Sequence, residues 1–259
     1  MCLLLISNNT NPEYPFVVAA NRDELYNRQT KKAGFWKEYP DLLAGKDLEA
    51  GGTWLGITRS GRFAAITNYR DMRTVKENAP TRGLLTLNFL VSNTLAFEYG
   101  KSLASMAAEY NGYNLLFSDM ENLFYFSNQT KELNKLSSGA YGLSNHLLDT
   151  PWPKVVKSKE AFISAVSKRK ISEQELFGIL SDNREAPEDQ LPDTGLSREL
   201  EKAVSPVFIK SENYGTRSST VILVNSVNEV LFVERSLDAG SGKWVESRFS
   251  FQLDIRNHA

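Results

Sequence analysis

The chain has 259 residues, and 41% of them are hydrophobic, which is enough for a sizeable packed core. Its 30 basic and 31 acidic residues leave a net charge of −1, so no electrostatic attraction to nucleic acid or to an anionic membrane is expected. One cysteine excludes an intramolecular disulfide, and the few Cys and His residues exclude the usual structural zinc sites. These features predict a cytoplasmic protein with no nucleic-acid partner, no metal site and no integral membrane segment, and the length fits one large domain or two small ones.

The first half of the chain predicts two β-hairpins and a helical stretch. An apolar run at residues 2–6, a turn-rich segment and a second apolar run at 16–20 predict a hairpin buried on both faces, with its first strand central in the sheet. Residues 52–58 and 62–68 predict a second hairpin around Gly61. Helical spacing over 84–110 predicts two helices that meet near Gly100.

The second half of the chain predicts strands, then helices, then strands again. Strands are expected at 113–118 and 123–127, and helices at 153–168 and 172–180, the latter with a capping box formed by Ser172 and Glu175. The proline-containing segment 181–197 is expected to be a surface loop. Closing strands are expected at 218–224, 229–234 and 248–253. Clustered strands and clustered helices predict an α+β protein with antiparallel sheets and helices packed outside them.

Cys2 is the most informative candidate for chemistry. If Met1 is removed, this residue carries a thiol and a free α-amine, whose pKa values of about 8.5 and about 7.7–8.0 allow a nearly balanced proton transfer. The amine would then act as the built-in base for a cysteine nucleophile. The alternative is a small buried hydrophobic residue that stands at position 2 by chance.

A polar tetrapeptide, Asn21-Arg22-Asp23-Glu24, directly follows the second predicted strand. A carboxylate of Asp23 could orient the ammonium of Cys2, and Arg22 could favour its thiolate. The alternative is a surface ion pair next to a turn-forming asparagine.

Three further residues could complete such a site. Asn68 ends the second predicted hairpin and Asn145 follows Gly142-Leu143-Ser144; each could donate an N–H to an oxyanion, or could be a turn residue. Arg217 precedes a predicted strand and could bind a substrate carboxylate or polarise the thiolate, although alone it is a weak signal. Trp54 lies in the glycine-rich segment of the second hairpin, and we expect it to line a ligand cleft together with Arg22 and Asn21.

These segments together resemble the transport and Golgi organisation 2 family, also called the NRDE family after residues 21–24. The resemblance extends from residue 1 to about residue 253 and rests on these motifs: Met1-Cys2, residues 19–24, 51–56, 67–69, 113–114, 141–145, 151–152, 214–217 and 234–236. It implies a single domain over residues 1–259 with an N-terminal nucleophile hydrolase fold, which is a four-layer αββα sandwich of two mostly antiparallel sheets between helical layers.

Within that group of folds the chain is most similar to the cysteine branch of choloylglycine hydrolases and penicillin V acylases. The resemblance implies a catalytic set at Cys2, Asp23, Asn68, Asn145 and Arg217. The branch commonly has an arginine three residues before the aspartate, and this chain has Ala20 there. Arg22 is the available substitute, and on a straight strand we expect it to point to the opposite face.

The resemblance also implies intracellular haem trafficking, with haem as a transported ligand and no catalytic cofactor. The sequence lacks a haem attachment motif, and its two histidines are His146, expected to be an ordinary loop residue, and the near-terminal His258. A thiolate at Cys2 or a tyrosine could ligate ferric haem. Three functions therefore remain open: a haem-binding protein, an N-terminal-cysteine amidohydrolase that cleaves an acyl amide, and a non-catalytic scaffold in lipid or membrane homeostasis. The sequence does not specify the oligomeric state.

Overall fold

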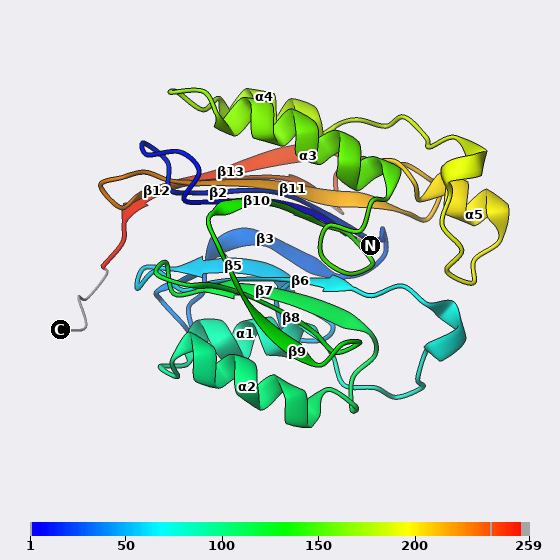
Figure 1. Cartoon of the computed structure of the whole chain (residues 1–259), viewed down its shortest axis with the longest axis horizontal. Helices are drawn as coiled ribbons and strands as arrows, with labels where there is room; N and C mark the ends of the chain where they lie inside the picture. Colours follow the sequence, from blue (N-terminus) through cyan, green and yellow to red (C-terminus); the bar gives the residue numbers. More distant parts are fainter. Residues whose placement is uncertain (1, 239, 255–259) are drawn as a thin grey trace.

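Two antiparallel sheets lie face to face between helical layers (Figure 1). The computed structural model describes residues 2–238 and 240–254, with side chains from residue 3 onward. Met1, His258 and the thiol of Cys2 therefore lie outside the described residues. Helices α3 and α4 cover one sheet, and α1 and α2 cover the other (Figure 1). The predicted αββα sandwich is confirmed.

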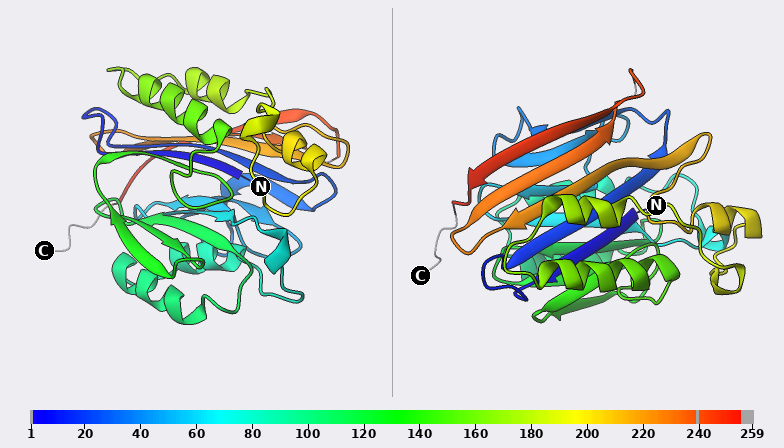
Figure 2. Two further views of the ribbon diagram at one scale, coloured as in Figure 1. Left: turned by 45° about the vertical axis from the view of Figure 1, so that its right-hand side comes forward. Right: turned by 90° about the horizontal axis from the view of Figure 1, so that it is seen from above.

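The first sheet contains six strands, and strands β1, β2, β10 and β11 position most of the candidate site. Its order is β10-β1-β2-β11-β12-β13, so β1 is an interior strand next to an edge rather than the centre of the sheet. The strand bounds are β1 (Cys2–Asn8), β2 (Phe16–Leu25), β10 (Gly139–Leu143), β11 (Tyr214–Val224), β12 (Glu229–Leu237) and β13 (Trp244–Gln252). Figure 2 shows that α3 and α4 lie over the β1, β2 and β11 side, while β13 extends beyond them.

The second sheet contains seven strands in chain order, from β3 to β9. Their bounds are β3 (Thr30–Phe35), β4 (Leu42–Asp47), β5 (Leu55–Thr58), β6 (Phe63–Asn68), β7 (Tyr113–Ser118), β8 (Leu123–Ser127) and β9 (Glu132–Leu136). The helices are α1 (Gly83–Val91), α2 (Ala96–Met106), α3 (Pro153–Val166), α4 (Glu173–Leu180) and α5 (Arg198–Ala203), with 3-10 turns at Met72–Thr74 and Glu188–Gln190. Among the described helices, none is long and apolar enough to cross a membrane.

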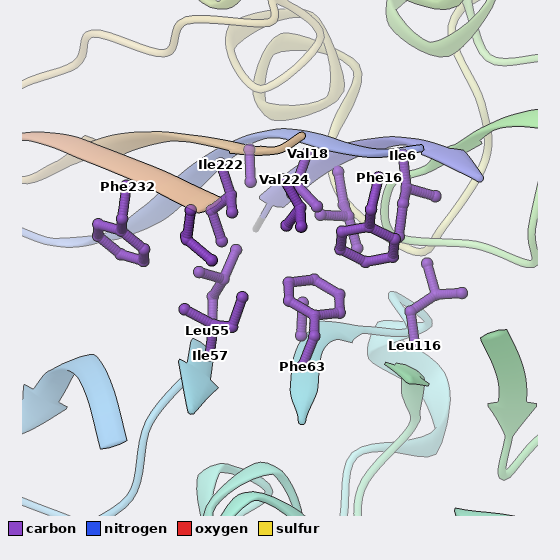
Figure 3. Packing of buried hydrophobic residues seen from close by; sticks show 14 of the residues in the cluster. Ile6, Phe16, Val18, Leu55, Ile57, Phe63, Leu116, Ile222, Val224 and Phe232 are labelled. Atoms are coloured by element: carbon purple, nitrogen blue, oxygen red, sulfur yellow. The ribbon is translucent and has the colours of Figure 1, made fainter. Parts of the chain in front are cut away.

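The continuous apolar runs of β1 and β2 are explained by burial on both faces. Leu4, Ile6 and Val18 face the second sheet, where Phe16 also packs edge-to-face on Phe63 with ring centroids 5.1 Å apart (Figure 3). The alternate residues, such as Leu5, face the α3–α4 layer. Side chains of a strand alternate between the two faces of its sheet, so both faces of these strands need apolar residues.

The structure corrects several predicted boundaries. Strand β2 continues to Leu25, so residues 21–24 lie within the strand instead of after it. Gly100 lies inside α2, where Leu133 packs against it, and the break between the two helices falls at residues 92–95. Strands β3, β4, β9 and β10 and helix α5 are elements that were not predicted from the sequence. Segment 181–197 is largely irregular as expected, with one 3-10 turn.

Candidate active site

The ends of several strands meet near the start of the chain. Cys2 begins β1 and is directly opposite Arg22 of β2. On the other side of β1, Leu4 pairs with Leu143 of β10, so Asn145 follows β10 at the level where β1 begins. The sheet therefore brings the backbone of Cys2 between Arg22 and the segment that carries Asn145.

Arg22 lies on the face of β2 that is directed toward the second sheet. It is 6% exposed, its guanidinium lies 4.3 Å from the ring centroid of Trp54, and it forms an ion pair with Glu24 at 3.6 Å. Ala20 lies on this same face, two residues earlier, and lines a small hollow beside Trp54. The expectation that Arg22 would point to the opposite face is therefore wrong, because residues 20 and 22 share one side of the pleat.

Asp23 lies on the other face of β2, toward the helices. It is 3% exposed and accepts a hydrogen bond of 2.6 Å from the hydroxyl of Thr216. Burial raises the pKa of this carboxyl, while the charges of Lys154 and Arg22 and the Thr216 hydrogen bond oppose that rise. Lys154 is itself buried and donates to the carbonyl of Val204 at 2.9 Å. The site thus contains a carboxyl group that is held away from bulk water.

The two predicted asparagines come together, but they do not have the same environment. Asn145 is fully buried, and its amide donates to the backbone carbonyl of Asn68 at 3.0 Å. Asn68 ends β6 and lines the cleft next to Arg22. Its side chain has no hydrogen-bond partner among the described residues. Asn68 is thus available to donate to a ligand, while Asn145 holds the backbone of Asn68 in place.

Arg217 is positioned at a β-bulge of β11, where the register with β2 shifts between Thr216 and Ser218. One of its terminal nitrogens donates to the backbone carbonyls of the β2–β3 connection, at 2.8 Å to Leu25, 2.9 Å to Tyr26 and 3.2 Å to Arg28. Burial, and then the charge of Arg22, lower the pKa of Arg217. This arginine therefore clamps a turn in addition to adding positive charge.

Asn21 is turned away from the cleft that the sequence analysis assigned to it. Its amide donates to the carbonyls of Leu180 and Val207, both at 2.8 Å, and its oxygen accepts from Ser219 at 2.6 Å. All of these partners lie on the helix-covered side of the sheet. Asn21 thus joins β2 and β11 to α4 and to the segment before β11.

Arg22 and Trp54 lie between two cavities and line both of them. The outer cleft has a volume of about 370 Å³ and contains the polar groups Asp23, Asn68 and Arg82. The inner pocket has a volume of about 230 Å³ and extends between the sheets toward Glu234. The ring of Trp54 packs directly on Gly45, where a methyl group would overlap it. The stacked pair therefore forms a wall between the two cavities.

The sequence analysis did not assign Glu234 to the site. It is 1% exposed and accepts a hydrogen bond of 2.7 Å from the backbone N–H of Ala33. Burial raises its pKa to about 7, against the smaller effects of that bond, of Thr220 and of Arg22. The signal that could have identified it is a single carboxylate after the apolar residues 230–233 of a strand, because ionised side chains are rarely buried without a partner.

His146 has the environment of a structural residue. Its ring nitrogens lie 2.9 Å from the hydroxyl of Tyr69 and 2.9 Å from that of Thr150. Burial lowers the pKa of its ring. With both nitrogens engaged, His146 does not fit the role of an axial haem ligand, in line with its expected role as a loop residue. Among the described residues, no group of three Cys, His, Asp or Glu could hold a metal ion.

Comparison with known proteins gives one family over nearly the whole chain. The family model described as "Transport and Golgi organisation 2" matches residues 1–239. The chain is 35% identical to the mouse "Transport and Golgi organization 2 homolog" and 36% identical to the corresponding bovine protein; each alignment covers 98% of this chain and 99% of the relative.

Two solved structures are similar in fold. The C2A mutant of conjugated bile acid hydrolase from Clostridium perfringens matches with a TM-score of 0.52 and 10% identity, over 100% of both chains. A Caenorhabditis elegans orthologue of N-acylethanolamine-hydrolyzing acid amidase matches with a TM-score of 0.50 and 11% identity, over 86% of this chain and 92% of that chain. At these identities the likeness concerns the fold alone, which is that of N-terminal nucleophile hydrolases.

Proposed function

The chain belongs to the transport and Golgi organisation 2 family on an N-terminal nucleophile hydrolase-like fold, and from this premise we propose that it is an N-terminal-cysteine amidohydrolase that cleaves an acyl amide. The observation that carries the proposal is the side chain of Asn68, which lines a polar cleft at the level where β1 begins with Cys2. One structural neighbour is named as a conjugated bile acid hydrolase and the other as an acid amidase that hydrolyses N-acylethanolamines, and hydrolysis by this chain would be in line with both names.

In the proposed reaction, removal of Met1 exposes the α-amine of Cys2. This amine takes the thiol proton, the thiolate attacks the amide carbonyl, and a tetrahedral oxyanion forms. The amide N–H of Asn68 stabilises the oxyanion, and Asn145 keeps Asn68 in place. The ammonium then protonates the leaving amine, and the acyl group stays on sulfur as a thioester.

The second half of the reaction releases the acid. A water molecule transfers a proton to the α-amine and attacks the thioester, and the thiolate leaves and is reprotonated. Asp23 supplies a buried carboxyl group close to the start of β1, with Thr216 fixing its orientation. Arg22, directly opposite Cys2, favours the thiolate over the thiol by its charge. The products are a carboxylic acid and an amine.

Four preparations of the full chain test this proposal on a panel of acyl amides: the wild type and three variants. Intact-mass spectrometry first establishes whether Met1 is absent. The wild-type protein should release amine, and Cys2→Ser should be strongly impaired. A chain with one extra residue before Cys2 keeps the thiol but lacks the free amine at Cys2, so it should be inactive. Asn68→Ala should lower kcat by about 10²–10³. Retention of Met1 on all molecules, or equal activity of the extended chain, would refute the mechanism.

Haem binding is a second candidate, favoured by the arginines around the outer cleft. Arg22, Arg28 and Arg82 line this cleft, and the guanidinium of Arg22 lies over the indole of Trp54. Cations and an aromatic ring together suit a planar ligand with two carboxylates. The proposal predicts a saturable Soret shift on titration with haem. The shift should persist in His146→Ala, since that ring is already engaged, and should change in Cys2→Ser if the thiolate is the iron ligand. Non-saturable adsorption would contradict it.

A further inference from the structure

Directly paired residues on neighbouring strands lead across the first sheet from Cys2 to the inner pocket. By strand register this row passes from Cys2 to Arg22, then to Ser218 of β11, Ser236 of β12 and Val245 of β13. Arg22, both serines and Val245 line the pocket. Because neighbouring strands are about 4.8 Å apart, Ser218 lies about 10 Å across the sheet from the backbone of Cys2. The pocket is therefore within reach of a molecule whose reacting carbonyl is at Cys2.

Arg217 and Ser218 line the pocket, and each has a buried hydrogen-bond donor for which the described residues supply no acceptor. The hydroxyl of Ser218 and the Nε–H of Arg217 are both buried, and neither has a hydrogen bond among the described residues. The Nε–H of arginine can only donate. A buried donor without an acceptor destabilises the fold, so a ligand that supplies an acceptor here removes that cost.

The acidic groups of the pocket, in contrast, already have donors. Glu234 accepts from Ala33 and Thr220, at 2.7 and 3.4 Å, and Asp238 accepts from the N–H and the hydroxyl of Ser241, at 2.8 and 2.7 Å. The remaining charged residues of the lining are all cationic: Arg22, Lys31, Lys32 and Arg217. The donors of Ser218 and Arg217 without an acceptor and the excess of positive charge both favour binding of an anion.

We propose that the inner pocket binds a carboxylate, so that the substrates of the Cys2 site are amides whose acyl group ends in a carboxylate. This assignment of substrate class rests on the proposed amidohydrolase function. A singly charged carboxylate is favoured over a doubly charged phosphate, because Glu234 lies buried in the same pocket and repels negative charge. Trp54 and Arg22 lie between the two cavities and would contact the linker that joins the amide to the carboxylate.

Binding of a carboxylate should be linked to protonation of Glu234. The bound anion disfavours the ionised form of this residue, while Arg22, Lys31, Lys32 and Arg217 favour it and Asp238 disfavours it. Since the pKa of Glu234 is already near 7, the ligand should drive proton uptake around neutral pH. Affinity should therefore rise as the pH falls from 8 to 6, and Glu234→Gln should remove most of this dependence.

The test uses the full chain with two kinds of probe. The first is a series of monoanilides of succinic, glutaric, adipic, suberic and sebacic acid. Each compound has one free carboxylate and is compared with the methyl ester of that carboxylate. We expect one preferred length, at which the free acid exceeds its ester at least tenfold in kcat/KM. The second is calorimetric titration of the same dicarboxylic acids at pH 6 and 8, which requires no catalysis. Ser218→Ala should weaken binding about tenfold, and Ser105→Ala, which removes an exposed hydroxyl on α2, is the matched control.

The two probes separate the possible failures. Binding of a dicarboxylate that Ser218→Ala weakens, without hydrolysis of any anilide, would refute the amidohydrolase and keep the carboxylate pocket. Hydrolysis with equal rates for acids and esters would refute the pocket and keep the enzyme. Absence of calorimetric binding, or tighter binding of alkylamines than of carboxylates, would overturn the inference itself.

Discussion

Replacement of Asn21 by alanine should destabilise the fold strongly. The side chain is 1% exposed and makes three hydrogen bonds of 2.6–2.8 Å, to the carbonyls of Leu180 and Val207 and to the hydroxyl of Ser219. Alanine leaves these groups buried without this partner, at about 1–3 kcal/mol for each unsatisfied group. Partial relaxation of Ser219 gives an expected loss of about 3–5 kcal/mol, which corresponds to a fall in Tm of roughly 6–20 °C for a chain of this size.

Urea unfolding followed by circular dichroism measures the loss, and Asn8→Ala is the matched control. Asn8 lies on the neighbouring strand β1 and makes one exposed hydrogen bond to Ser137, so its replacement should change stability by less than about 0.5 kcal/mol. Asn21→Asp should be worse than Asn21→Ala, because a carboxylate oxygen would then face the two carbonyl oxygens. A loss below about 1 kcal/mol for Asn21→Ala with an unchanged m-value would show that the contacts do not stabilise the fold as argued.

Three further perturbations test other parts of the structure. Glu201→Ala should cost about 3–5 kcal/mol in urea unfolding, since it leaves the buried guanidinium of Arg70, 2.9 Å away, without this carboxylate. The pKa of Glu234 is raised from 4.5 to about 7 in the fold, so between these pH values the native state binds more protons than the unfolded chain. The free energy of unfolding should therefore fall by up to about 3 kcal/mol as the pH rises from 4.5 to 7. Glu234→Gln should make this pH profile flatter. Gly45→Ala should displace the ring of Trp54 and cost about 1–3 kcal/mol, with a shift in tryptophan emission as the readout; unchanged emission would contradict the packing.

The sequence predicted the elements whose local pattern is strong. Runs of leucine and aromatic residues, such as those of β7 and β8, were located correctly, and Ser172 caps α4 by accepting from the N–H of Glu175 as expected. Strands β3 and β9 were missed because they lie at the edges of the second sheet and carry exposed polar residues such as Lys31 and Lys32. An exposed edge strand lacks the apolar alternation on which such predictions rely.

Most of the residues of the candidate site could be predicted from their positions at the ends of strands, but their relative arrangement in space could not. The pairing of β1 with β10 joins segments more than a hundred residues apart, and no local pattern shows that Asn145 returns to the level of Cys2. The partners of Arg217 are backbone carbonyls of a turn, which have no signature in the sequence. The pocket around Glu234 forms only when five strands of two sheets come together.

The side chains of strand β2 point alternately to the two faces of its sheet, which explains why some of residues 21–24 stabilise the fold and others line the candidate site. Since side chains of a strand point in turn to either face, Asn21 and Asp23 reach the helix-covered side while Arg22 reaches the cavities between the sheets. A shift of one residue in the register of β2 would exchange these environments, with the guanidinium placed against the carbonyls of Leu180 and Val207 and the amide against Trp54. The hydrogen bonds of Asn21 therefore fix the register that keeps Arg22 opposite Cys2, so a residue with no contact to the cleft determines how the cleft is charged.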